Sequence, residues 1–196
     1  MRVAKLSSME KKRIIVRRAM GADVAMIARV VAEAIGDKSA LTEYCGENFL
    51  AVLEEVAATL GTQYYYQSAL IAEVNGVTAG AIIGYDGEQL AALREGTFSV
   101  LQSRIGRVPT IADETEAGEY YLDSIAVLPE FRGQGVARAL INTFCEKAFA
   151  EGHNRVGLIV DIDNPRAERL YTSLGFERVG TRIFFGHKMW HLQRKR

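Results

Sequence analysis

The sequence predicts an α/β protein, α+β in some schemes, in which helices flank a mixed central sheet. Two blocks in the second half of the chain carry this prediction, because each places an apolar strand before a turn that opens an amphipathic helix. A hairpin in the first half adds antiparallel strands, since Asn75-Gly76 separates two alternating apolar segments. Helix-linked parallel strands and a tight hairpin together predict a mixed sheet.

The first half of the chain is expected to hold a strand, two helices and then two strands. The first helix follows Asp23 and stops at Gly36, and its apolar residues recur at helical spacing. The other expected elements lie at residues 13–18 (strand), 49–60 (helix), 68–74 (strand) and 77–85 (strand).

A glycine-bearing turn lies between a predicted strand at 120–128 and a predicted helix at 134–150. The first N–H groups of a helix have no intrahelical partner and the helix dipole is positive there, so the turn suits an anion such as phosphate. Gly133 and Gly135 allow the backbone to approach that anion closely. Residues of the helix that repeat every four positions predict its buried face, namely Val136, Leu140, Phe144 and Ala148.

Two other glycine-rich nucleotide motifs do not fit this turn. A P-loop requires Lys and then Ser or Thr after its last glycine, whereas Gly135 precedes Val136 and Ala137. A dinucleotide-binding fingerprint requires a third glycine where Arg138 stands. The turn therefore indicates an anion site of another kind.

The second block ends at Phe176 and has clear boundaries. Its apolar run at 156–160 is typical of a central parallel strand covered on both faces. Asn164 can cap the next helix, Pro165 fits the first helical position and Gly175 follows the helix end.

Together the two blocks predict one strand–helix–strand crossover. The helix at 134–150 joins parallel strands at 120–128 and 155–161, and such connections are almost always right-handed. Strands at 176–180 and 187–192 complete the expected sheet.

Both blocks resemble the signatures of the GNAT superfamily of N-acetyltransferases. The matching patterns are Arg132-x-x-Gly135-x-Ala137 and Asn164-x-x-Ala167-x-x-Leu170-Tyr171-x-x-x-Gly175-Phe176. The resemblance implies a splayed pair of parallel strands, with acetyl-CoA as co-substrate and its pantetheine arm between them. It implies cofactor contacts from Ile125, Ala126, Val127, Arg132, Gly133, Gln134, Gly135, Val136, Ala137, Arg138, Asn164, Ala167 and Tyr171.

The resemblance also implies transfer of an acetyl group to a primary amine by direct attack. An alkyl amine with a pKa near ~10.4 is mostly protonated at neutral pH, so a general base helps. Asp123 is the expected base, six positions before Pro129, where many relatives carry Glu; the alternative is an ion-paired or water-facing strand residue. Tyr171 has the position of the acid for the departing thiolate, or is a core aromatic, and the N–H of Val127 is expected at the oxyanion.

Two other functions stay open from the sequence. A non-catalytic acyl-CoA binding or sensing module would share the cofactor turn but would need neither Asp123 nor Tyr171. An acetyltransferase with a protein amine as acceptor would keep both residues. The acceptor, a small-molecule amine or a peptide, is not specified, and Tyr44, Glu47 and Trp190 are candidates to line its site.

Residues 88–119 depart from a minimal member of the family. Residues 88–101 are expected to hold a helix or two, and the acidic run at 112–119 leads into the strand. These carboxylates either border the acceptor site, where they attract a cationic amine, or form a solvated acidic loop.

The composition is that of an ordinary soluble globule, with 48% hydrophobic and 24% charged residues among 196. We expect a basic tail at 1–12 and one N-acetyltransferase domain at 13–196. The formal net charge of zero disfavours nucleic acid or an anionic membrane as a partner. With no apolar run long enough to cross a bilayer, the expected location is cytoplasmic, with a homodimer as an open option.

The cysteines and histidines predict neither a disulfide nor a metal site. Cys45 and Cys145 are only two, so reduced structural thiols are expected. His187 and His191 would share a strand face, but two histidines without a third ligand do not indicate a metal. Ser124 lacks the surroundings of a hydrolase nucleophile.

Overall fold

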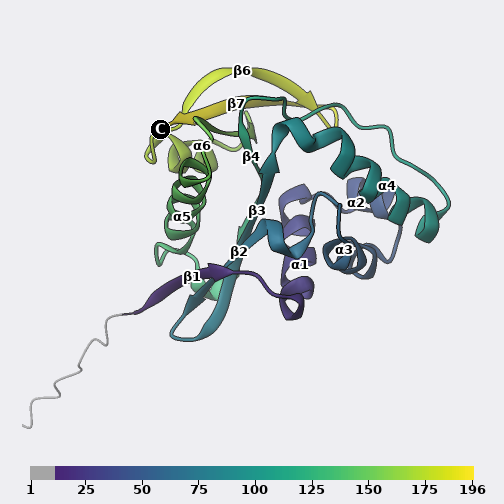
Figure 1. Cartoon of the computed structure of the whole chain (residues 1–196), viewed down its shortest axis with the longest axis horizontal. Coiled ribbons are helices and arrows are strands. Elements are labelled where there is room, and N and C mark those ends of the chain that lie inside the picture. Colours follow the sequence, from purple (N-terminus) through teal and green to yellow (C-terminus); the bar gives the residue numbers. More distant parts are fainter. Residues whose placement is uncertain (1–11) are drawn as a thin grey trace, which may run out of the picture.

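The computed structural model describes residues 12–196, so most of the basic tail expected at 1–12 lies outside the described residues. Seven strands of these residues form one sheet in the order β1-β2-β3-β4-β5-β7-β6 (Figure 1). Only the pair β4–β5 is parallel in this part of the chain, which confirms the predicted mixed sheet. The strands are β1 (Ile14–Arg18), β2 (Ala69–Val74), β3 (Val77–Asp86), β4 (Tyr120–Val127), β5 (Arg155–Asp161), β6 (Glu177–Phe184) and β7 (His187–Lys195).

Helices cover both faces of the sheet. Figure 1 shows α5 and α6 on one face and the first four helices on the other. The helices are α1 (Val24–Ile35), α2 (Lys38–Cys45), α3 (Phe49–Ala58), α4 (Leu90–Ile105), α5 (Val136–Ala150) and α6 (Pro165–Thr172). Within residues 12–196 no helix is both long enough and apolar enough to cross a bilayer.

The predicted buried face of α5 is confirmed, because its apolar residues are at most 1% exposed. They pack on the sheet with residues of β4, β5 and α6 in one apolar cluster. A second cluster lies on the other face, between the sheet and α1 and α3. The hairpin is also confirmed, since Asn75 and Gly76 both have positive φ, at 52° and 81°.

Two elements differ from the prediction. Residues 37–47, between the first two predicted helices, contain a further helix, α2, which Asp37 caps by accepting a hydrogen bond from the Ala40 N–H at 2.8 Å. β6 extends to Phe184 rather than ending near Gly180, because it pairs with β7 along its whole length.

β4 and β5 part soon after they begin. Their only paired positions in the register are Tyr120 with Val156 and Tyr121 with Gly157. Both strands then continue, β4 to Val127 and β5 to Asp161, while β3 and β7 pair their outer edges. A gap therefore opens in the middle of the sheet.

The segment expected to depart from the minimal family fold forms α4 and the loop after it. α4 contacts the loop before β2 closely, because a Cβ on Gly96 would lie 2.2 Å from the Gly61 carbonyl oxygen. The Gln63 N–H donates to the Thr97 hydroxyl at 3.1 Å in the same contact. This contact holds α4 against the loop that follows α3.

We expect Gly96→Ala to lower the free energy of unfolding by about 1–3 kcal/mol, because the added methyl group displaces the Gly61 carbonyl. Helix propensity alone would favour this substitution by about 1 kcal/mol, so a net loss isolates the steric clash. Urea denaturation measures it. Gly180→Ala is the control, since a Cβ there meets no atom of the described residues within 4 Å; equal stability of the two variants would contradict the contact.

Candidate active site

The edge of β4 that faces the gap presents backbone groups that β5 does not pair. The Leu128 N–H donates to the Ala79 carbonyl of β3 at 2.8 Å. Because N–H groups alternate along a strand, those of Ile125 and Val127 point to the other side, into the gap, while that of Ala126 points to β3. A linear polar chain lying in the gap would find hydrogen-bond donors there.

The turn after β4 has the conformation that its glycines predict. Gly133 and Gly135 have φ values of 73° and 86°, and Gly135 caps α5. Gln134 donates to the Glu130 carbonyl at 2.8 Å and accepts from the Lys12 ammonium at 3.0 Å. Of the next residues, Val136 is buried, Ala137 is half-buried and Arg138 donates to the Ser173 hydroxyl at 2.9 Å.

Arg132 links the turn to two other elements. Its Nε donates to the Val127 carbonyl at 2.9 Å, and its Nη2 contacts the Glu33 carboxylate of α1 at 3.2 Å. The guanidinium is half exposed, so a phosphate group at the turn would compete with Glu33 for it.

α6 begins as predicted, because Asn164 accepts a hydrogen bond from the Ala167 N–H at 3.1 Å. Tyr171 is the last residue but one of α6, is 8% exposed and meets Phe176 edge to face, with ring centroids 5.8 Å apart. Burial raises the pKa of Tyr171 to about 12.

Asp123 occupies an irregular position of β4. The register with β3 shifts between Ser124 and Leu122, so Asp123 is the extra residue of a β-bulge. Its Oδ1 accepts from the Ser124 hydroxyl at 2.8 Å, and its Oδ2 lies 2.9 Å from the Tyr85 hydroxyl. Burial, with the nearby Glu114 charge second, raises the pKa of Asp123 to about 7.

Glu114 joins Asp123 in a buried polar network. Its Oε1 lies 3.0 Å from both the Tyr85 hydroxyl and the Gln63 amide, and its Oε2 accepts from Arg94 of α4. Glu114 is 3% exposed, and burial raises its pKa despite the Arg94 charge. The expectation of a solvated acidic loop is therefore wrong for Glu114, because it folds inward to meet Arg94.

A second acidic residue of the run, Glu119, is also buried, at 1% exposure. It accepts hydrogen bonds from His191 at 2.8 Å, Gln193 at 2.7 Å and Thr115 at 2.6 Å. Burial disfavours its charged form, but these hydrogen bonds together lower the pKa of Glu119. Gly157 makes room for it, since a Cβ there would lie 1.9 Å from the Glu119 carboxylate.

A sequence profile of the Acetyltransferase (GNAT) family matches residues 41–176, more than half of the chain. The chain belongs to the GNAT family of acetyltransferases. The fold agrees, since the mixed sheet with one parting parallel pair is the architecture expected from the resemblance.

Solved structures resemble this GNAT chain over nearly all of its length. A crystal structure of an acetyltransferase is 34% identical to it, with a TM-score of 0.78, and covers 92% of this chain and 98% of that one. The N-acetyltransferase from Staphylococcus aureus Mu50 is 26% identical, with a TM-score of 0.80 and coverage of 91% and 99%.

A curated relative shares only part of its length. The uncharacterized protein ML0378 of Mycobacterium leprae (strain TN) is 34% identical over 105 residues, which are 54% of this chain and 23% of that protein. The chain thus spans less than a quarter of that relative.

The three residues expected to line the acceptor site of this GNAT chain do not come together. Tyr44 is buried against α1 and α3, and its ring meets Phe185 of the β6–β7 turn at 6.1 Å. Glu47 is exposed. Trp190 packs with the α5 side of the sheet, under the guanidinium of Arg178 at 4.0 Å. The contact between Tyr44 and Phe185, which sequence reasoning missed, joins α2 to that turn.

Titratable groups elsewhere follow the sequence in part. Cys45 and Cys145 are free, buried thiols, as expected, and burial raises the pKa of both. His187 lies 3.0 Å from Asp161, whereas His191 pairs with Glu119. Residues 12–196 contain no group of three His, Cys, Asp or Glu side chains that could hold a metal ion.

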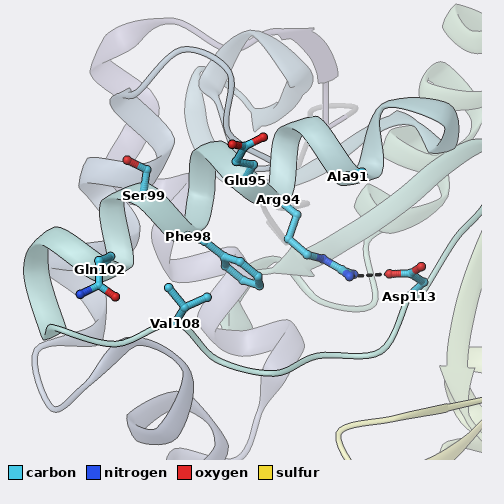
Figure 2. A pocket seen from close by; sticks show the side chains of 8 residues that line it. All are labelled: Ala91, Arg94, Glu95, Phe98, Ser99, Gln102, Val108 and Asp113. Atoms are coloured by element: carbon cyan, nitrogen blue, oxygen red, sulfur yellow. Dashed lines mark hydrogen bonds and ion pairs between the residues drawn. The ribbon is translucent and has the colours of Figure 1, made fainter.

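An open hollow lies along the outer side of α4. Figure 2 shows Phe98 and Val108 facing each other across it, while Arg94 reaches from the helix to Asp113, with 2.5 Å between Nη1 and Oδ1. Arg94 therefore touches this hollow and the buried Glu114 at once.

We expect the stability of the protein to fall as pH rises through the titration of Asp123. A carboxyl whose pKa rises on folding from 3.8 to about 7 binds more protons when folded, so its contribution is complete below about pH 4 and lost above about pH 7. Asp123→Asn removes this dependence. We compare the free energy of unfolding of Asp123→Asn with that of the wild type at each pH. The difference should shift in favour of the variant by on the order of 2–4 kcal/mol between pH 4 and pH 8.

Urea denaturation at several pH values measures the difference. Asp113→Asn is the control, because this side chain is 72% exposed and its removal should leave the pH dependence unchanged. A constant difference between Asp123→Asn and the wild type from pH 4 to pH 8 would show that Asp123 titrates normally.

Proposed function

We propose that this chain transfers an acetyl group from acetyl-CoA to a primary amine by direct attack of the amine on the thioester. The observation that carries the proposal is the gap between β4 and β5. The glycine turn that caps α5 follows the end of β4, and Asp123 and Tyr171 belong to opposite sides of the sheet at this gap.

Family membership and backbone geometry support a site for CoA. The N-terminus of α5 would hold the pyrophosphate through its free N–H groups, with Gly133 and Gly135 allowing close approach. The gap-facing N–H groups of Ile125 and Val127 would bond the pantetheine arm as an added strand does. Ala167 and Asn164 of α6 would border the arm from the other strand.

Structures that share this fold contain CoA. The NatC complex bound to Gag peptide and CoA is 15% identical to this chain, and the aminoglycoside acetyltransferase AAC(6')-Ib with coenzyme A and kanamycin is 20% identical, each with a TM-score of 0.60. The second bound molecule differs, Gag peptide in one complex and kanamycin in the other. A small-molecule or peptide amine therefore stays the acceptor class that we propose here.

Asp123 would act as the general base. A base is most effective when its pKa lies near the working pH, and burial raises the pKa of Asp123 to about 7. Freeing an alkyl amine of its proton at neutral pH costs roughly 4–5 kcal/mol, which such a base offsets in part. The N–H of Val127 would then stabilise the oxyanion that forms on attack.

Tyr171 would act on the sulfur atom of the leaving group mainly as a hydrogen-bond donor. With the pKa of Tyr171 at about 12 and that of a thiol near ~8.5, complete proton transfer to a thiolate is uphill by about 5 kcal/mol. A donated hydrogen bond stabilises the developing negative charge without that cost.

Thiol release from acetyl-CoA, measured across a panel of small amines, amino acids, aminoglycosides and peptides, tests the proposal. Release that depends on an added amine, with an acetylated product seen by mass spectrometry, is the expected result. Tight CoA binding by calorimetry, combined with no release for any amine of the panel, would instead favour a binding or sensing module.

We expect Tyr171→Phe to lower turnover by roughly 10-fold to 10,000-fold, because only the hydroxyl donor is lost. The affinity for acetyl-CoA should stay nearly unchanged. Tyr65→Phe is the matched control, since Tyr65 lies before β2 and its ring is tilted against that of Tyr66, with ring centroids 4.6 Å apart. Full turnover of Tyr171→Phe would assign the tyrosine to the core alone.

We expect Gly135→Glu to weaken acetyl-CoA binding by at least about 10-fold, because a carboxylate at the helix N-terminus repels the pyrophosphate. Gly152→Glu is the control. It places the same side chain at the other end of α5, on a glycine with similarly positive φ (98° against 86°), so backbone strain is matched. Equal CoA affinity of the two variants by calorimetry would place the phosphates elsewhere.

A further inference from the structure

We propose that Glu114 is a positioning residue for catalysis, which acts through the Tyr85 hydroxyl to hold Asp123 ready to accept the proton of the acceptor amine. This inference rests on the proposed function, in which Asp123 is the base. It adds a residue from the loop after α4, which lies outside both signature blocks.

The contacts form a chain of two carboxyl groups with a hydroxyl between them. The Tyr85 oxygen lies 2.9 Å from Asp123 Oδ2 and 3.0 Å from Glu114 Oε1. The Gln63 amide donates to both Tyr85 and Glu114, at 3.0 Å each. Arg94 binds the far oxygen of Glu114, so its charge stabilises Glu114 as a carboxylate.

Counting protons shows what this chain favours. The Tyr85 hydroxyl has one proton and can donate it to only one of the two carboxyl groups at a time. If Asp123 and Glu114 are both ionised, the Tyr85 hydroxyl donates to one carboxylate and its oxygen lies against the other with no proton between them. Contact between two acceptors without a proton is unfavourable. If Asp123 is protonated, it donates to Tyr85 while Tyr85 donates to Glu114, and each contact has its proton.

The step on the acceptor balances as a single proton transfer. The N–H bond of the attacking ammonium or amine breaks, an O–H bond forms on Asp123, and the electron pair of that N–H bond stays on nitrogen. The Tyr85 proton stays on its oxygen and only turns from Asp123 to Glu114. Glu114 thus accepts a hydrogen bond and never the transferred proton.

The groups around Asp123 come from several elements, and most of them are neutral. Ionised groups among them are Glu114, which favours a proton on Asp123, and Arg94, which opposes it. The pKa values of the surrounding tyrosines are raised, first by burial, so these side chains stay neutral at physiological pH. The groups are Tyr85 of β3, Tyr121 and Ser124 of β4, Tyr44 of α2, Tyr64 before β2, Arg94 of α4 and Glu114 of the following loop.

Glu114→Gln tests the inference, because it removes one charge and keeps the side-chain shape. We expect the acidic limb of the pH profile of kcat/KM to move to lower pH by about one unit. Turnover at pH 8 should fall by about 3- to 10-fold, because Asp123 becomes a weaker base. Glu116→Gln is the matched control, since this carboxylate lies two residues along the same loop and is 66% exposed; its limb should not move.

Tyr85→Phe gives the opposite expectation. Loss of the hydroxyl removes a hydrogen bond to ionised Asp123, so the acidic limb should move to higher pH by about one unit. In the Tyr85→Phe background, Glu114→Gln should shift the limb less than it does in the wild type. This variant also keeps the test available if Glu114→Gln does not fold by circular dichroism.

A second readout separates this inference from the proposed function. Carbon-13 NMR of labelled aspartate carboxyl groups follows the titration of Asp123 directly, with Asp123→Asn identifying its signal. The inference is overturned if the titration midpoint of Asp123 does not move in Glu114→Gln, or if the acidic limb of kcat/KM does not move to higher pH in Tyr85→Phe. Amine-dependent thiol release would in that case still support the proposed function. A moved midpoint without thiol release for any amine supports the coupling and rejects the function.

Discussion

The candidate site depends on one constraint, that β4 and β5 pair at two positions only and then separate. Parallel strands normally continue side by side, because each added residue completes further hydrogen bonds. Here the outer edges of both strands are held by β3 and β7, so the inner edges can part without the sheet coming apart. The gap exposes backbone N–H groups of β4 between two apolar layers.

The loop after α4 contributes to both ends of this arrangement. At the paired end, Glu119 crosses Gly157 and binds His191 and Gln193, which ties the start of β4 to β5 and β7. Farther along, Glu114 meets Tyr85 beside the bulge at Asp123. The segment between β3 and β4 is thus packed into the fold through Glu114 and Glu119, and in our proposal it influences the protonation of Asp123.

The features that the sequence predicted well depend on interactions between residues that are close in the chain. The turn at Asn75, the cap at Asn164 and the left-handed glycine Gly175 each depend on residues within a few positions, and all three occur. The polar network depends on distant pairs: Glu114 is 51 residues from Gln63 and 29 from Tyr85. The spacing of apolar residues along the sequence does not indicate such pairs. The one available signal was Arg94, a cation in the helix expected at 88–101 that could pair with the acidic run.

The burial that raises the pKa of Asp123 also makes this residue costly for the fold. A carboxyl whose pKa moves from 3.8 to about 7 destabilises the folded state by roughly 4 kcal/mol once it is ionised. The bulge and the Tyr85 hydroxyl hold this residue at the edge of the gap, where an incoming ammonium would relieve the cost by supplying the opposite charge or the missing proton. In the proposed function, the free energy that ionised Asp123 costs the fold would favour binding of a cationic amine beside it.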